Sequence, residues 1–97
     1  MLFRSDVIKI EDTGAGDYAR TLGVPAGREA PVFLAINRNK RGMRLDLKKA
    51  EGVRAFLDLA ARAQVVVESF RPGVVDRLGV GYEAVRAVNP AIVYCAI

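Results

Sequence analysis

The segment Val65–Gly73 constrains the fold of this 97-residue chain more than any other. It begins with three consecutive valines, and such a branched apolar run is typical of a strand buried on both faces of a parallel sheet. The polar and cationic turn Ser69-Phe70-Arg71 follows, and a proline and a glycine then precede a short predicted helix, Val74–Leu78. In open parallel sheets, ligands bind beyond the carboxyl ends of the strands, where helix N-termini favour anions. The segment therefore predicts an α/β fold with a site for a phosphate-bearing or nucleotide-like ligand.

Apolar patterns along the rest of the chain predict alternating strands and helices. Strands are expected over Asp6–Glu11, Arg44–Leu47, Gln64–Glu68 and Ala91–Ile97, and helices over Ala50–Ala63, Val74–Leu78 and Gly81–Val88. Asp12–Pro31 is predicted to be a long loop, and Val32–Ile36 a short apolar element of uncertain type. This order favours a right-handed parallel α/β unit. A parallel sheet needs both of its faces covered, and only two long helices are predicted for four strands. We therefore expect this chain to be a segment of a larger fold.

The composition excludes several classes of protein. The chain is 52% hydrophobic and 27% charged, which fits a globular fold rather than a disordered one. No apolar run is long enough to predict a membrane span. The absence of histidine excludes Ser-His and Cys-His nucleophile pairs, and no metal site is expected. The single cysteine, Cys95, lies in an apolar run, so we expect it in the core of a cytoplasmic protein.

Positive charge is concentrated in one stretch of a chain whose net charge is +4. Between residues 38 and 49 only Asp46 opposes six cations, namely Arg38, Lys40, Arg41, Arg44, Lys48 and Lys49. Such a cluster favours an anionic partner, either nucleic acid or a phosphorylated small molecule, although a solvated face is the simpler alternative. The few aromatic residues, three Tyr and four Phe, make nucleic acid the less favoured of the two partners.

Short blocks in a fixed order cover nearly the whole chain. They are Val7–Glu11, Gly16-Asp17 with Arg20, Asn37–Arg41, Leu45–Lys48, Val67–Gly73, Leu78-Gly79 and Asn89-Pro90. In this order they resemble the family III CoA-transferases, which include formyl-CoA transferase and carnitine CoA-transferase and are related to α-methylacyl-CoA racemase. The resemblance covers only an early part of these longer proteins.

The resemblance implies that residues 1–97 are part of the Rossmann-like large domain that binds coenzyme A, with a parallel sheet and flanking helices. Full-length members are interlocked homodimers that move CoA from an acyl-CoA donor to a carboxylic acid. A catalytic aspartate forms a mixed anhydride with the acyl group, and in this family it lies beyond the position of residue 97. We therefore expect no catalytic residue within these residues and no turnover from them alone. Two alternatives remain open. In the first, the chain is part of a racemase-type enzyme, and in the second it is a small basic module that binds nucleic acid.

The resemblance also assigns contacts with coenzyme A to eight residues. They are Leu45, Asp46, Leu47, Lys48, Ser69, Phe70, Arg71 and Arg77. Lys48 and Arg77 would meet the phosphates, and the turn at Phe70 would receive the adenine and ribose phosphate. Ser69 stands where the family usually has asparagine, which exchanges an amide for a hydroxyl. Each of these assigned contacts has a structural alternative. The alternative for Phe70 is a position in the core, for Lys48 and Arg71 an ordinary place on the surface, and for Arg77 an ion pair with a neighbouring acid.

Overall fold

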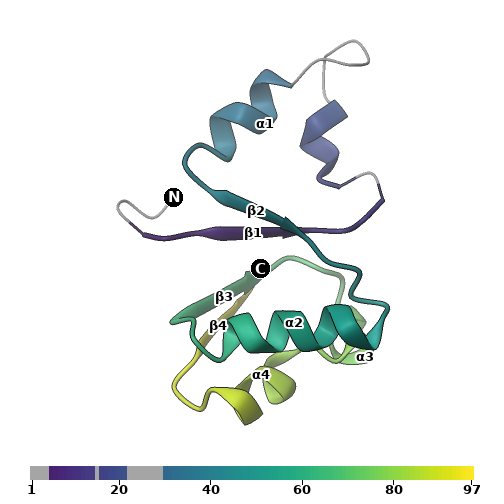
Figure 1. The fold of residues 1–97 in the computed structure, drawn as a ribbon, viewed down its shortest axis with the longest axis vertical. Helices are drawn as coiled ribbons and strands as arrows, with labels where there is room; N and C mark the ends of the chain where they lie inside the picture. Colours follow the sequence, from purple (N-terminus) through teal and green to yellow (C-terminus); the bar gives the residue numbers. More distant parts are fainter. Residues whose placement is uncertain (1–4, 15, 22–29) are drawn as a thin grey trace. The chain divides into compact units, whose positions relative to one another are not determined.

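The structure of the chain is a computed structural model that describes residues 5–14, 16–21 and 30–97. The chain forms two compact units, Met1–Arg44 and Leu45–Ile97, and each contains one pair of parallel strands with its own helices (Figure 1). None of the helices in the described part is long and apolar enough to cross a membrane. The α/β class predicted from the sequence is confirmed.

In the first unit, strand β1 (Ile8–Glu11) pairs in parallel with β2 (Arg41–Arg44), so that Ile8 faces Arg41 and Glu11 faces Arg44. The chain between these strands carries the 3-10 helix η1 (Tyr18–Thr21) and helix α1 (Pro31–Ile36). The apolar element of uncertain type is therefore a helix. The predicted loop Asp12–Pro31 includes η1, while its residues 15 and 22–29 lie outside the described part of the chain.

The predicted strand Arg44–Leu47 is wrong, because the second strand lies three residues earlier and ends at Arg44. Leu45 precedes a turn and Leu47 lies in it. Asp46 makes this turn: its Oδ1 accepts a hydrogen bond from Lys48 N at 3.0 Å, and its carbonyl accepts one from Lys49 N at 3.1 Å. A short side-chain acceptor that bonds to the backbone two residues later favours a turn over a strand.

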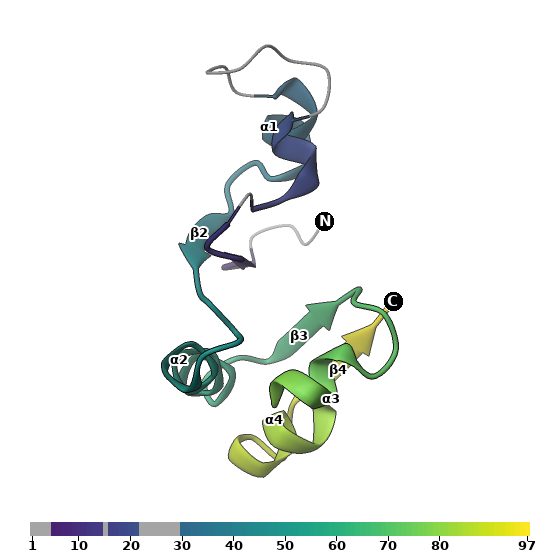
Figure 2. The ribbon, with the colours of Figure 1, turned by 90° about the vertical axis from the view of Figure 1, so that its right-hand side faces the viewer.

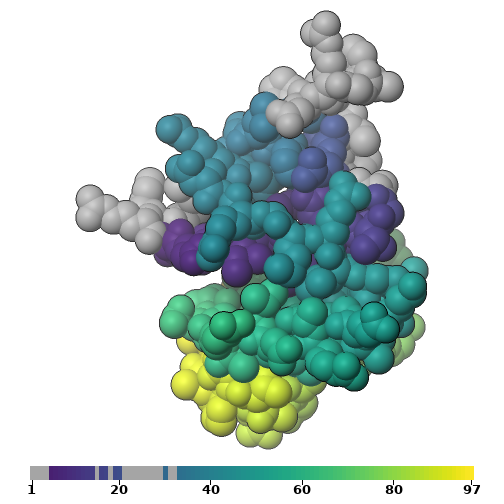
Figure 3. Space-filling view, viewed as in Figure 1, coloured from purple at the N-terminus to yellow at the C-terminus, as the bar shows by residue number. Residues whose placement is uncertain are grey.

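In the second unit, β3 (Val65–Glu68) pairs in parallel with β4 (Val93–Ala96), and three helices accompany them: α2 (Ala50–Ala60), α3 (Val74–Leu78) and α4 (Tyr82–Val88). The predictions for these elements are confirmed to within one residue at each end, except that α2 ends three residues early in a tighter turn and β4 begins two residues late. Helix α2 fills the middle of the visible face of this unit in Figure 3, with α4 and the turn after it below.

The core of the second unit lies between its helices and one face of the strand pair (Figure 2). Ala60 of α2, Val85 of α4 and Ile92 are buried together, and Val66 of β3 and Tyr94 of β4 pack against them. Val66 faces Tyr94 across the ladder, so this pair marks the covered face.

The opposite face of the strand pair corrects two expectations. Val67 is 58% exposed and Val93 is 60% exposed, so β3 is not buried on both faces within the described chain. Cys95 faces Val67 in the register and is also exposed, which contradicts the expected core position of its thiol. Successive strand side chains point to opposite faces, and the described helices cover only the face of Val66 and Tyr94.

Candidate functional site

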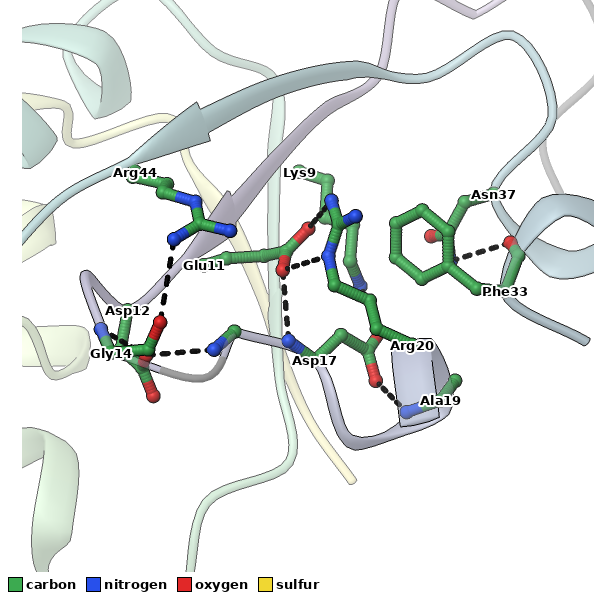
Figure 4. A network of polar contacts seen from close by, with 11 residues as sticks. Lys9, Glu11, Asp12, Gly14, Asp17, Ala19, Arg20, Phe33, Asn37 and Arg44 are labelled. Atoms are coloured by element: carbon green, nitrogen blue, oxygen red, sulfur yellow. Dashed lines mark hydrogen bonds and ion pairs between the residues drawn. The ribbon is translucent and has the colours of Figure 1, made fainter. Parts of the chain in front are cut away.

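The buried carboxylate of Glu11 organises the first unit (Figure 4). Its Oε2 accepts hydrogen bonds from Asp17 N and from Arg20 Nε, both at 2.8 Å, and its Oε1 accepts one from Arg20 Nη2 at 2.8 Å. The hydrogen bonds from Arg20 lower the pKa of Glu11 from 4.5 to about 2, although burial of the carboxylate opposes this shift. Glu11 therefore stays ionised at neutral pH and is poorly suited to donate a proton there.

The acidic residues around Glu11 are also engaged within the unit. Asp17 pairs with Lys9 at 2.6 Å and accepts a hydrogen bond from Ala19 N at 2.9 Å, and these contacts lower the pKa of Asp17. Asp12 accepts hydrogen bonds from the backbone of Gly14 and Gly16. The Gly-Asp-x-x-Arg block thus serves to fix the loop after β1.

Arg20 joins this network to helix α1. Its guanidinium carbon lies 3.9 Å from the centre of the Phe33 ring, as Figure 4 shows from close by. Gly16 adopts the left-handed conformation with φ of 78°, and a Cβ there would overlap Glu11 Oε2. The network is therefore closely fitted, and it explains why glycine stands at this position of the block.

A hollow in the second unit combines cations with an apolar surface. Hollow 1 has a volume of about 470 Å³. It is lined by Leu47, Lys48, Lys49, Ala50, Val53, Arg54, Leu57, Arg77 and Leu78. These residues come from the turn before α2, from the first two turns of α2 and from the end of α3. An amphipathic ligand with an anionic part matches this lining.

Local packing explains how the chain builds hollow 1. The first turn of α2 lies so close to the Asp46 carbonyl that a Cβ at Gly52 would overlap it. Helix α3 is capped by Gly79, which has φ of 84°, and a Cβ there would make only an ordinary contact with Val53 Cγ1 at 3.7 Å. Gly52 thus allows the turn before α2 to lie against this helix, and Gly79 supplies the left-handed conformation that ends α3.

Four cationic side chains line hollow 1, and none of the residues lining it is acidic. These side chains belong to Lys48, Lys49, Arg54 and Arg77, and they carry its positive charge. Within the described chain none of the four forms an ion pair, so the alternative considered for Arg77, an ion pair with a neighbouring acid, is not observed. Helix α2 begins here with no side-chain cap at Lys49. Unpaired cations at an uncapped helix N-terminus favour an anionic ligand.

A second hollow lies at the carboxyl ends of β3 and β4. Hollow 2 has a volume of about 580 Å³. It is lined by Glu68, Phe70, Arg71, Pro72, Gly73, Val75, Asp76, Tyr82, Tyr94, Ala96 and Ile97. Phe70 is 50% exposed, which excludes the core position considered for it. The rings of Tyr82 and Tyr94 meet edge to face with centroids 5.9 Å apart. An exposed aromatic ring in a hollow that an arginine also lines suits a flat aromatic ligand.

Polar contacts hold the walls of hollow 2. Glu68 Oε1 accepts a hydrogen bond from Phe70 N at 2.8 Å, which fixes the turn after β3. The hydroxyl of Tyr94 donates to the carbonyl of Val80 at 3.1 Å. Burial, followed by the charges of Glu68 and Asp76, raises the pKa of Tyr94, so this phenol keeps its proton.

The structure divides the eight predicted contact residues between these places. Leu47, Lys48 and Arg77 line hollow 1, although Lys48 and Arg77 are far apart in the sequence. Phe70 and Arg71 line hollow 2. The other three residues, Leu45, Asp46 and Ser69, line neither hollow, and Asp46 serves to shape the turn before α2.

Sequence reasoning missed two cations of hollow 1. Lys49 is part of the dense basic stretch and Arg54 lies in the predicted helix Ala50–Ala63, but neither is among the eight predicted contact residues. The signal for Arg54 is its position four residues after Ala50, because residues at this spacing share a helix face. Two cations of the basic stretch have partners within the first unit: Arg41 forms an ion pair with Asp6, and Arg44 donates a hydrogen bond to the Gly14 carbonyl.

Residues 5–14, 16–21 and 30–97 contain no group of three or more Cys, Asp or Glu side chains that could hold a metal ion. The four cations of hollow 1 make that hollow unsuitable for a cation.

Comparisons with known proteins give one consistent result. A sequence model of CoA-transferase family III matches residues 5–97. The chain is 42% identical over 94 residues to human succinyl-CoA:glutarate CoA-transferase, covering 96% of this chain and 22% of that protein. It is 46% identical over 90 residues to acetyl-CoA:oxalate CoA-transferase of Acetobacter aceti, covering 92% of this chain and 23% of that enzyme.

A solved structure gives the same result for the fold. A CAIB/BAIF family protein from Brucella suis matches with a TM-score of 0.85 and 41% identity. The match covers 94% of this chain and 25% of that protein. The chain thus spans about a quarter of the length of its relatives.

Proposed function

The chain belongs to CoA-transferase family III, and from this membership we propose that it supplies CoA-binding residues to an enzyme that transfers CoA between an acyl-CoA and a carboxylic acid. In this proposal residues 1–97 are part of the CoA-binding large domain. The relatives act on acyl-CoA thioesters and carboxylic acids, as their names state.

The unpaired cations of hollow 1 are the observation that carries this proposal. Coenzyme A combines a pyrophosphate and a ribose phosphate with an apolar pantetheine chain. Lys48 and Arg77 supply positive charge for the phosphates, and Leu47, Val53 and Leu57 supply an apolar wall. Hollow 2 would take the adenine ring, which stacks on the exposed face of Phe70 beside Arg71.

The chemistry of the complete reaction belongs to the same proposal. The only buried carboxylate of the described chain is Glu11, and its pKa of about 2 makes it a weak base that Arg20 already occupies. Following the family resemblance, we propose that the acyl-accepting aspartate, which forms a mixed anhydride, is not among these residues. A homodimer and a cytoplasmic location, the latter suggested by the single free cysteine, complete the proposed enzyme.

Calorimetric titration of the chain with CoA tests the proposal. We expect saturable binding that Lys48→Gln and Arg77→Gln each weaken about tenfold, because each variant removes one charge-assisted contact to phosphate. Arg62→Gln is the matched control: it removes the same charge from an exposed position that lines neither hollow. Equal affinity of all four proteins, or no binding at all, would contradict the proposed site.

Competition separates this proposal from the nucleic-acid alternative. A short single-stranded oligonucleotide should not displace CoA from the chain. If the oligonucleotide bound instead, with an affinity that falls steeply as salt increases, the basic stretch would be a nucleic-acid surface.

A further inference from the structure

We propose that Glu68 is a positioning residue for hollow 2: its carboxylate holds the turn after β3 so that the ring of Phe70 stays presented to an aromatic ligand. The inference rests on the proposed function, in which this ligand is the adenine ring of CoA. It concerns a residue to which the family resemblance assigned no contact. Glu68 acts through Phe70 and not by a contact of its own with the ligand.

The ring of Phe70 has little packing to orient it. The residue is 50% exposed, and within the described chain neither an aromatic ring nor a guanidinium stacks on it. A side chain or loop that must be ordered when a ligand binds lowers the affinity, because the lost conformational entropy opposes binding. The backbone of the turn therefore has to hold this ring in place before the ligand arrives.

Backbone hydrogen bonds fix the turn only at its two ends. Before the turn, the carbonyl of Glu68 accepts a hydrogen bond from Ile97 N at 2.9 Å, and after it the carbonyl of Arg71 accepts one from Val74 N at 3.1 Å. Between these points the described structure has one further hydrogen bond, from Phe70 N to Glu68 Oε1 at 2.8 Å. The carboxylate of Glu68 thus restrains the one residue of the turn whose aromatic ring lines hollow 2.

The position of Glu68 on β3 explains why its carboxylate is available for this bond. Side chains two residues apart on a strand share a face, so Glu68 lies on the covered face with Val66. Burial and then the charge of Glu68 raise the pKa of Tyr94, which faces Val66 from β4, so the carboxylate lies on the side of this phenol. Glu68 forms no ion pair within the described chain. A partly buried carboxylate without a cation needs a hydrogen-bond donor, and the N–H of Phe70 supplies it.

Calorimetric titrations with CoA and with 4′-phosphopantetheine, which lacks the adenine ring, test the inference. Glu68→Ala removes the acceptor and should weaken the binding of CoA about fivefold, the factor that corresponds to the net contribution of one hydrogen bond. The same variant should bind 4′-phosphopantetheine within about twofold of the unchanged chain. Glu68→Gln keeps an acceptor oxygen without the charge, so its affinity for CoA should also stay within about twofold. Glu83→Ala is the matched control, because it removes a carboxylate from an exposed position that lines neither hollow.

The amide of Phe70 reports the same contact in the absence of ligand. Its proton signal should move upfield in Glu68→Ala, because the hydrogen bond to the carboxylate is lost, and it should move less in Glu68→Gln. The amides of β3 and β4 should exchange with solvent at rates within about twofold of those in the unchanged chain. Faster exchange of the β3 and β4 amides, in step with the loss of CoA binding, would show that Glu68 only stabilises the unit and would overturn the positioning role.

Each other binding result has a distinct meaning. Equal affinity of Glu68→Ala and the unchanged chain for CoA would overturn the inference and leave the proposed function intact. Equal weakening by Glu68→Ala and Glu68→Gln would overturn it as well, because the charge would then act on the ligand directly. Tighter binding by both variants would mean that the carboxylate repels the phosphates, which also contradicts positioning. Failure of the unchanged chain to bind CoA would refute the proposed function, and the inference with it.

Discussion

Replacing Glu11 by glutamine should loosen the first unit of the chain selectively. Glutamine has the shape of glutamate, but it is neutral and presents an amide donor where Arg20 Nη2 now donates to Oε1. Folding lowers the pKa of Glu11 from 4.5 to about 2, and each tenfold change in an acid dissociation constant corresponds to about 1.4 kcal/mol. Because the Arg20 side chain is 38% exposed, solvent screening reduces the energy of its pair with Glu11. We therefore expect Glu11→Gln to lower the free energy of unfolding of the first unit by about 2 to 3 kcal/mol.

Amide hydrogen exchange followed by NMR measures this loss in each unit separately. At pH 7 the hydrogen-bonded amides of β1 and β2 should exchange about 30- to 150-fold faster in Glu11→Gln than in the unchanged chain. The amides of β3 and β4 are an internal reference, because all contacts of Glu11 lie in the first unit. Exchange of the β1 and β2 amides within twofold of the original rate would refute the assigned role of Glu11.

The pH dependence gives a second, independent check. A carboxyl whose pKa is lower in the folded state stabilises the fold above its unfolded pKa, and this stabilisation is lost as the pH falls through its folded pKa. The difference in the stability of the first unit between the unchanged chain and Glu11→Gln should therefore be constant above about pH 5.5. It should decline as the pH falls from 4.5 to about 2. Glu83→Gln is the control, because Glu83 forms an exposed pair with Arg86 that is worth less than about 0.5 kcal/mol.

Two further substitutions test the packing of the second unit. Gly52→Ala should lower its stability by about 2 kcal/mol, because the new methyl group overlaps the Asp46 carbonyl, whereas Gly42→Ala, with nothing near the added group, should change the thermal midpoint little. Asn89→Ala should cost about 1 to 2 kcal/mol in urea unfolding, because Asn89 Nδ2 donates to the carbonyls of Ala60 at 3.0 Å and Ala63 at 2.8 Å. Equal stability of Asn89→Ala and the unchanged chain would show that these carbonyls need no such donor.

Most elements of the second unit follow from local sequence patterns. Helix α4 has apolar residues at helical spacing and ends before Pro90, and β3 is a short branched run, so both were predicted at nearly the observed bounds. The second strand was misplaced because Arg41–Arg44 carries no apolar alternation and becomes a strand only by pairing with β1. The exposure of Val67 and Cys95 could not be predicted either, since burial depends on which faces the helices cover.

The candidate site was only partly predictable, because local patterns identify single residues but not which of them come together. Lys48 and Arg77 were identified by their blocks, but nothing local indicates that they line the same hollow as Arg54. Their convergence depends on the close approach of the Asp46 carbonyl to α2 at Gly52 and on the left-handed end of α3 at Gly79. How these segments pack is a property of the tertiary structure, and sequence periodicity carries no information about it.

The use of charge differs between the two units and explains why binding is the role proposed for this chain. In the first unit, Asp6, Glu11 and Asp17 are each paired with a cation of the same unit. Their negative charge is used to hold the chain together, so none of them is available as a base. The cations of hollow 1 in the second unit have no described partner and no acidic neighbour in the lining. These exposed cations create a local positive potential that attracts an anion such as a polyphosphate ligand. The chain is therefore suited to hold the phosphates of a thioester substrate, and under this proposal the acyl-accepting carboxylate comes from other residues of the enzyme.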